Sequence, residues 1–256
     1  MTLIGLLLAV VMGLTLGLLG GGGSVLAVPI LVYAFGFDAK EAVAASLAVV
    51  GLTSLFGAAE HWRTDCIKLR VALVFGPIAA AGAYLGAHLA ALLSGAAQLS
   101  LFAVVMLVAA VFMFRNGGPV KDGDEAYAPD SVGRLFLRFA LPGIGVGVLT
   151  GLVGVGGGFL VVPALVLLGG IPMEAAVGTS LLVIAMNSFA GFAGYLGKAD
   201  IPWGLMSLFV VLAAAGSFAG AYLLRFVPEN ALKKGFAVFL VAMAVFILYE
   251  NGGGLL

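Results

Sequence analysis

Two glycine clusters, each followed by a proline, are the residues whose types and spacing most directly suggest chemistry. They stand in GLLGGGGSVLAVPIL, residues 17–31, and in GLVGVGGGFLVVPAL, residues 151–165. Glycine and proline interrupt a helix, and the unpaired N–H groups at the start of the next helix favour anions. We therefore expect an anion site built from two breaks. The expected donors are Gly22, Gly23, Ser24, Gly156, Gly157 and Gly158, with Ser24 as an N-cap hydroxyl and with Pro29 and Pro163 at the breaks.

The same glycines could instead serve a tight turn or close helix packing. We favour the site because the pattern occurs twice with its proline in register.

A row of small polar side chains forms the second candidate feature. Spacings of seven and eight residues place them on one helical face in each copy. A lone serine would bond back to a carbonyl one turn earlier, whereas a face present twice favours a shared polar cavity. The expected ligand contacts are Ser46 and Thr53 in the first copy and Thr179, Ser180 and Asn187 in the second; Ser54 and Ser188 lie on the same face.

An enzymatic alternative is an intramembrane serine protease, with Ser24 as nucleophile and His88 as base. The second copy has Gly158 and Tyr222 at the matching positions, which removes both groups. Cys66 is the only cysteine, so the chain has no pair of thiols for redox chemistry or a cysteine-rich metal site. We therefore expect no enzyme activity, no metal and no cofactor.

Composition indicates which elements must position these residues. Hydrophobic residues make up 63% of the 256 positions and charged residues 9%, whereas soluble domains carry about 25% charged residues. This composition predicts an all-α polytopic membrane protein whose partners are the lipid bilayer and a small anionic substrate. The net charge of zero does not suggest nucleic-acid binding, and the sequence leaves the oligomeric state open, a homo-oligomer included.

The chain contains an internal duplication. Gly17 and Gly151 are 134 positions apart, and the same offset pairs Pro29 with Pro163, Ser46 with Ser180 and Gly82 with Gly216. Each copy contains five apolar segments, at residues 2–19, 25–35, 39–59, 67–93 and 96–114 and at residues 135–153, 159–168, 173–195, 201–227 and 231–249. The second segment of each copy is shorter than the ~20 residues that cross a bilayer.

Basic residues predict opposite orientations for the two copies. Arg63, Lys68 and Arg70 precede the fourth segment of the first copy, whereas Lys233 and Lys234 follow the fourth segment of the second. By the positive-inside rule we expect two inverted-topology repeats, residues 1–114 and 135–256, joined by a cytoplasmic linker at residues 115–134, with both termini outside. Each repeat is then a glycine-broken re-entrant or hairpin pair followed by three transmembrane helices.

Inverted repeats with broken helices are the layout of secondary transporters, which work by alternating access at a midplane site. No carboxylate lies in the middle of a predicted span to relay protons. A potential of about 100 mV drives a monovalent anion outward by ~2.3 kcal/mol, so we expect voltage-assisted export. A transporter or channel for another small anion, a cation or a neutral solute is the alternative.

The second copy, from GLVGVGGGFLVVPALVLLGG to GTSLLVIAMNSFAGF, resembles the repeat of the TauE/SafE family of sulfite exporters, also called the 4-toluenesulfonate uptake permease family. The stretch EHWRTDCIKLR resembles the family's loop before the fourth segment. The resemblance implies an inner-membrane permease for sulfite, sulfonates or related anions. It adds His61 and Arg63 as a gate or an anion-attracting entrance. The first copy departs from the pattern, with Ala45 opposite Thr179 and Ser24 opposite Gly158.

Overall fold

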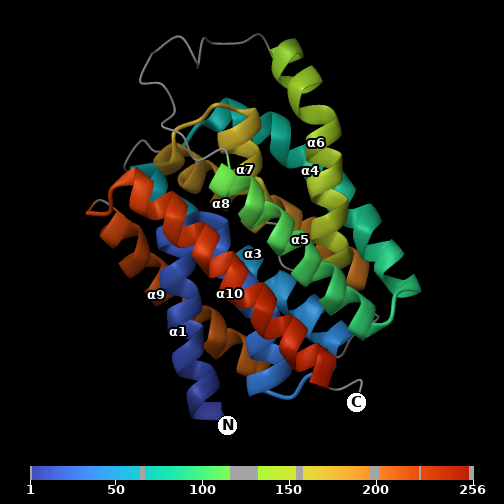
Figure 1. The fold of residues 1–256 in the computed structure, drawn as a ribbon. Coiled ribbons are helices and arrows are strands. Elements are labelled where there is room, and N and C mark those ends of the chain that lie inside the picture. Colours follow the sequence, from blue (N-terminus) through green and yellow to red (C-terminus); the bar gives the residue numbers. More distant parts are fainter. Residues whose placement is uncertain are drawn as a thin grey trace.

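The computed structural model describes residues 2–63, 67–115, 132–153, 158–196, 202–224 and 226–253, and all regular structure within these ranges is helical (Figure 1). Gly156, Gly157 and residues 116–131 of the expected linker lie outside the described residues. The elements in chain order are α1 (Thr2–Leu19), η1 (Gly20–Leu26), α2 (Ala27–Pro29), η2 (Ile30–Ala34), α3 (Ala39–Arg63), α4 (Leu69–Leu89), η3 (Ala90–Leu92), α5 (Gly95–Arg115), α6 (Val132–Val153), α7 (Gly158–Pro163), η4 (Ala164–Leu168), α8 (Met173–Tyr195), α9 (Trp203–Leu224) and α10 (Glu229–Gly253).

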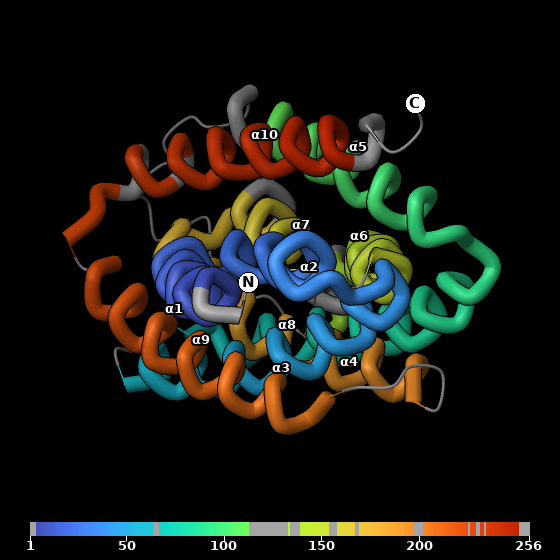
Figure 2. The backbone as a smooth tube through the Cα atoms, turned by 90° about the horizontal axis from the view of Figure 1, so that it is seen from below, coloured from blue at the N-terminus to red at the C-terminus, as the bar shows by residue number. Residues whose placement is uncertain are grey.

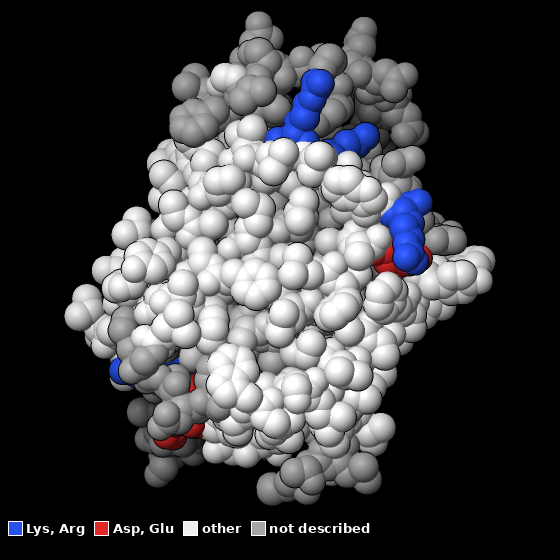
Figure 3. All heavy atoms as spheres, turned by 180° about the vertical axis from the view of Figure 1, so that it is seen from behind, with Lys and Arg blue, Asp and Glu red and all other residues white. Residues whose placement is uncertain are grey.

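Among the described residues, six segments are long and apolar enough to cross a membrane. Figure 3 shows the charged side chains of one face near its upper and right edges and at its lower left, with a broad uncharged surface between them. A wide uncharged surface around long apolar helices suits hydrocarbon rather than water. The chain is a multi-pass membrane protein.

The helices form three rows when the molecule is viewed from below (Figure 2). The first row contains α5 and α10, which pack against each other. The central row contains α1, α2, α7 and α6, and the third contains α3, α4, α8 and α9. The first glycine-rich segment, η1, and the helix α7 are buried inside the molecule.

Glycines join the central row to the third row. Gly13 of α1 faces the carbonyl of Ala213 in α9, and the matching Gly147 of α6 faces the carbonyl of Ala79 in α4. Gly216 and Gly86 make similar contacts from the opposite sides of these two pairs. A Cβ at any of these positions would collide with backbone, so glycine is what allows each pair of helices to approach this closely. We call these two contacts the glycine seams.

The chain reverses direction at the end of α1. Gly5 packs against the ring of Phe35, and Gly23 packs against Leu16, so η1, α2 and η2 fold back along α1. Gly20, the first residue after α1, has φ +63°, a left-handed conformation that ends a helix. We call α1, η1, α2 and η2 together the α1 hairpin. Its returning part begins at Gly20, five residues before the expected second segment at residues 25–35.

The short segments that we call the arms, η1–α2–η2 in the first copy and α7–η4 in the second, end in the same turn. Pro29 ends α2 and Pro163 ends α7, and a π-helical turn follows each proline directly. Gly36 and Gly170 then take left-handed φ values of 77° and 64°. The wide turns are closed by bonds from the N–H of Phe35 to Ile30 O and from the N–H of Gly169 to Ala164 O.

The third helices of the two copies, α3 and α8, pack together and run antiparallel. A Cβ on Gly57 would lie 3.2 Å from Leu181, and a Cβ on Gly191 would lie 3.4 Å from Leu47. These two contacts are the same contact made once from each copy.

The glycine seams can be tested within α6. Gly147→Ala places a methyl against the backbone of Ala79, and we expect it to lower the melting temperature or the yield of folded protein. Gly145→Ala is the matched control because nothing lies within 4 Å of its Cβ. In a helix alanine is favoured over glycine by about 1 kcal/mol, so this control should be neutral or stabilising. Equal melting temperatures for both variants in detergent would contradict the seam.

Candidate functional site

The tip of the α1 hairpin meets the start of α7 in the interior of the molecule. Gly21 lies backbone to backbone against Gly158, and both residues are buried. Gly20 lies against α8, where an added Cβ would come within 2.8 Å of the Ser180 hydroxyl. The structure thus brings together the first glycine cluster, Gly158 and Ser180. Without side chains, the backbones of the two arms approach each other directly.

The remaining residues of the first cluster pack against α10, against α1 and within η1. Gly22 faces Phe236 of α10, and Gly23 faces Leu16 of α1. The Ser24 hydroxyl donates to the carbonyl of Gly21 at 2.7 Å. The expectation that Ser24 caps a helix is therefore wrong, because this hydroxyl bonds back within η1. Close packing and a tight turn account for several of these glycines, as the alternative in the sequence analysis allowed.

Five fully buried polar side chains lie on α3, α8 and α9 and have side-chain atoms without a hydrogen-bond partner among the described residues. We call them the polar cluster: Thr53, Ser54, Asn187, Ser188 and Ser217. Neither end of the Asn187 amide has a partner. An unsatisfied buried polar group costs about 1–3 kcal/mol, so this arrangement calls for a role other than stability.

Ser217 makes the polar cluster unequal in its two halves. A Cβ at Gly57 would lie 2.7 Å from the Ser217 hydroxyl oxygen, which places Ser217 within a turn of Thr53 and Ser54. At the matching place, a Cβ at Gly191 would lie 3.9 Å from the methyl of Ala83. The first half therefore presents three hydroxyls, and the second half presents one hydroxyl and one amide.

Two of the expected contacts on this face have hydroxyls that bond locally. Ser46 donates to Val43 O at 2.8 Å, and Ser180 donates to Val177 O at 2.7 Å. These matching bonds leave the oxygen lone pairs as acceptors, and Ser180 presents its oxygen toward Gly20.

Thr179 has a structural partner at the start of α4. The backbone N–H of Lys68 donates to the Thr179 hydroxyl at 2.9 Å. The matching positions are Pro202, which has no N–H, and Ala45, which has no hydroxyl. The matching pair therefore has neither the donor nor the acceptor of this bond. Because the Thr179 oxygen only accepts here, its hydroxyl hydrogen can donate to another group.

His61 and Arg63 point in different directions at the end of α3. His61 is buried, and its Nε2 lies 3.2 Å from the carbonyl oxygen of Gly17. The Arg63 side chain is exposed and lies 3.6 Å from the Glu60 carboxylate. The structure does not bring the two residues together: His61 contacts the α1 hairpin, and Arg63 stays at the surface.

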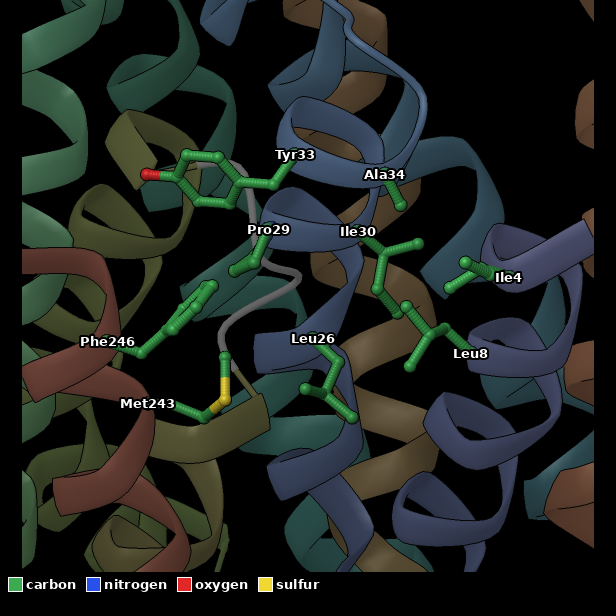
Figure 4. Close-up of a pocket in the computed structure, with 9 residues that line it drawn as sticks. All are labelled: Ile4, Leu8, Leu26, Pro29, Ile30, Tyr33, Ala34, Met243 and Phe246. Atoms are coloured by element: carbon green, nitrogen blue, oxygen red, sulfur yellow. The ribbon is translucent and has the colours of Figure 1, made fainter. Parts of the chain in front are cut away.

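A groove of 440 Å³ opens beside the α1 hairpin (Figure 4). Its walls are apolar side chains of α1, η1, α2, η2 and α10, and the hydroxyl of Tyr33 points away from the other lining residues. The lining residues are Ile4, Leu8, Leu26, Pro29, Ile30, Tyr33, Ala34, Met243 and Phe246. Such a lining suits hydrocarbon and offers little to an anion, so the groove and the polar cluster are separate features.

Sequence reasoning did not select three of the cluster residues as ligand contacts. Ser54 and Ser188 were recognised on the polar face, and their identity at the 134-residue offset was the available signal. Ser217 was missed because its counterpart is Ala83, so the repeat carries no sign of it.

Comparisons with known proteins identify relatives along the whole chain. The family model of the sulfite exporter TauE/SafE matches residues 5–247. A probable membrane transporter protein of Xylella fastidiosa is 28% identical over 95% of this chain and 93% of its own length. The probable membrane transporter protein YdhB of Bacillus subtilis is 28% identical over 92% of this chain and 94% of its own. No solved structure matches significantly.

Gly20→Ala tests whether the hairpin tip must approach Ser180. An alanine in the left-handed conformation costs about 1 kcal/mol, and here its methyl would also press on Ser180 and Val177. Gly36→Ala is the control, because it has the same strain with nothing within 4 Å of its Cβ. We expect the melting temperature to fall clearly further in Gly20→Ala than in Gly36→Ala. Equal losses would mean that only the backbone conformation matters at Gly20.

Proposed function

The chain belongs to the sulfite exporter TauE/SafE family of membrane transporters, and from this premise we propose that it carries small sulfur-containing anions across the cell's inner membrane. Sulfite and organosulfonates are the proposed substrates. The proposed site lies where the α1 hairpin meets α7, beside the polar cluster of α3, α8 and α9. Gly22, Gly23, Gly156 and Gly157 belong to this site as backbone donors, and Thr53 and Asn187 as side-chain donors.

The observation that carries this proposal is the polar cluster. Five buried groups on α3, α8 and α9 without partners among the described residues are destabilising, because in apolar surroundings only a polar solute or water can satisfy them. Hydroxyl and amide groups can donate to the oxygens of a sulfite or sulfonate. They do so without a fixed positive charge, so such a site would bind with modest affinity and release its anion readily.

The helix packing supports alternating access between two bodies that each contain helices of both repeats. The glycine seams join α1 to α9 and α6 to α4, while α3 packs on α9 and α8 packs on α4. We propose that one body is α1, α3 and α9 and that the other is α4, α6 and α8. The extensive α3–α8 contact then lies between the bodies, and both of these helices carry unsatisfied groups.

Because α3 and α8 run antiparallel, we propose that the repeats have inverted topology. The distribution of basic residues supports the further proposal that both termini lie outside and the linker is cytoplasmic. Rocking of one body against the other would then open the site to one side and close it to the other.

Substitutions in the polar cluster separate a transport role from a structural one. Thr53→Val and Asn187→Leu keep the number and branching of the side-chain heavy atoms and remove the unsatisfied groups, so we expect an unchanged or higher melting temperature. Loss of a hydrogen bond to an anion should lower sulfite flux into proteoliposomes by about tenfold or more. Ser207→Ala is the control, since its exposed hydroxyl bonds only to Gly204 O in the same helix.

Two outcomes would contradict this assignment. A lower melting temperature in both variants would mean that the groups have structural partners. Normal sulfite flux in both variants would place the anion elsewhere.

The driving force is a second test. A potential of about 100 mV supplies ~2.3 kcal/mol, which corresponds to nearly a fifty-fold gradient of a monovalent anion. In proteoliposomes at equal pH, we expect an imposed voltage to drive sulfite and methanesulfonate toward the positive side. Chloride and sodium in the same assay test the rival substrates. Flux that requires a pH gradient and ignores voltage would contradict uncoupled export.

A further inference from the structure

Two buried hydrogen bonds tie the ends of α1 and α6 to the ends of α3 and α8. His61 Nε2 lies 3.2 Å from Gly17 O, and the Tyr195 hydroxyl donates to Gly151 O at 3.1 Å. His61 is 2% exposed and Tyr195 is 6% exposed. His61 and Tyr195 are 134 positions apart, as are Gly17 and Gly151, so the two bonds are the same contact made by different side chains.

The accepting carbonyls lie where a helix needs outside donors. Gly17 and Gly151 each stand two residues before the end of their helix, at Leu19 and Val153. The last four carbonyls of a helix have no donor one turn further along, and in a membrane interior water does not replace it. Because a carbonyl only accepts, Nε2 of His61 must carry the hydrogen of this bond.

The tie is stronger at the end of α6. Gln98 of α5 donates from its Nε2 to Leu152 O at 3.1 Å, next to the carbonyl that Tyr195 holds. The counterpart of Gln98 is Leu232, whose side chain has no donor to offer the carbonyl of Leu18. The end of α6 therefore has two side-chain donors where the end of α1 has His61.

We propose that His61 and Tyr195 are positioning residues that hold the ends of α1 and α6. Each residue fixes the end of one helix relative to the helix that carries one half of the polar cluster, α3 for His61 and α8 for Tyr195. The helix end and the polar face of one half then move as a unit. The effect on transport rests on the proposed function; the tie itself does not.

Hydrogen exchange of the purified protein tests the tie without a transport assay. His61→Leu removes the donor, and we expect amides of residues 18–26 to exchange about fivefold faster while residues 158–168 stay unchanged. Tyr195→Phe removes a single hydroxyl and should produce the reverse pattern, with a smaller change because Gln98 remains. His61→Gln keeps an N–H donor at similar reach and should restore slow exchange.

His88→Leu is the matched control. Its ring bonds to the Tyr84 carbonyl one turn earlier in the same helix, at 3.0 Å, so its loss leaves the contact of His61 with Gly17 in place. Unchanged exchange of residues 18–26 in folded His61→Leu protein would overturn the proposal. Faster exchange over the whole chain in His61→Leu would also overturn it, because it would indicate a general structural role.

Sulfite transport gives the second readout. We expect His61→Leu to raise the KM for sulfite by about fivefold, with His61→Gln near the wild-type value. A lower maximal rate at unchanged KM, in proportion to folded protein, would argue against positioning. If the wild-type protein carries no sulfite but the exchange pattern holds, the tie stands and the proposed substrate falls.

Discussion

A helix that ends inside a membrane leaves backbone carbonyls and amides that the lipid cannot satisfy, and much of this structure answers that constraint. At the end of α1 the answer has three parts. Gly20 turns the chain back at φ +63°, His61 reaches the carbonyl of Gly17, and η1 continues with its own short-range bonds. The end of α6 uses Tyr195 and Gln98 for the same purpose. The end of α1 is therefore stabilised by a donor from α3, and the end of α6 by donors from α5 and α8.

The sequence predicted the features that depend on glycine and proline positions and on the internal repeat. Residues 2–19 and 173–195 were expected as segments and coincide with α1 and α8, because glycine or proline flanks them and ends the helical pattern. The second segment was expected to begin at residue 25, but helical structure already resumes at Gly20. The run of glycines predicted a break, whereas in the structure it forms a 3₁₀ helix. His61 could not be assigned from spacing, because its partner is a carbonyl on another helix and its counterpart is a tyrosine.

Differences between the two copies follow from local pairing. The N–H of Lys68 bonds to Thr179, whereas the matching Pro202 and Ala45 have neither the donor nor the acceptor. Ser217 and Gln98, by contrast, have apolar counterparts in Ala83 and Leu232, so each adds a polar group to one half only. Duplication thus supplied a common framework, and single substitutions made its two halves unequal, with more hydroxyls at one half of the cluster and more donors at one helix end.

The distribution of small and polar residues separates contacts that should stay closed from one that should open. Glycines on α1, α9, α6 and α4 bring backbones together over the length of the seams, and such contacts lose packing energy as soon as the helices part. The helices α3 and α8 instead carry buried hydroxyl and amide groups without partners among the described residues, and such groups would gain hydrogen bonds if the two helices parted. In the proposed transport cycle, a motion that opens the α3–α8 contact would keep both seams intact and would expose these groups to a polar solute.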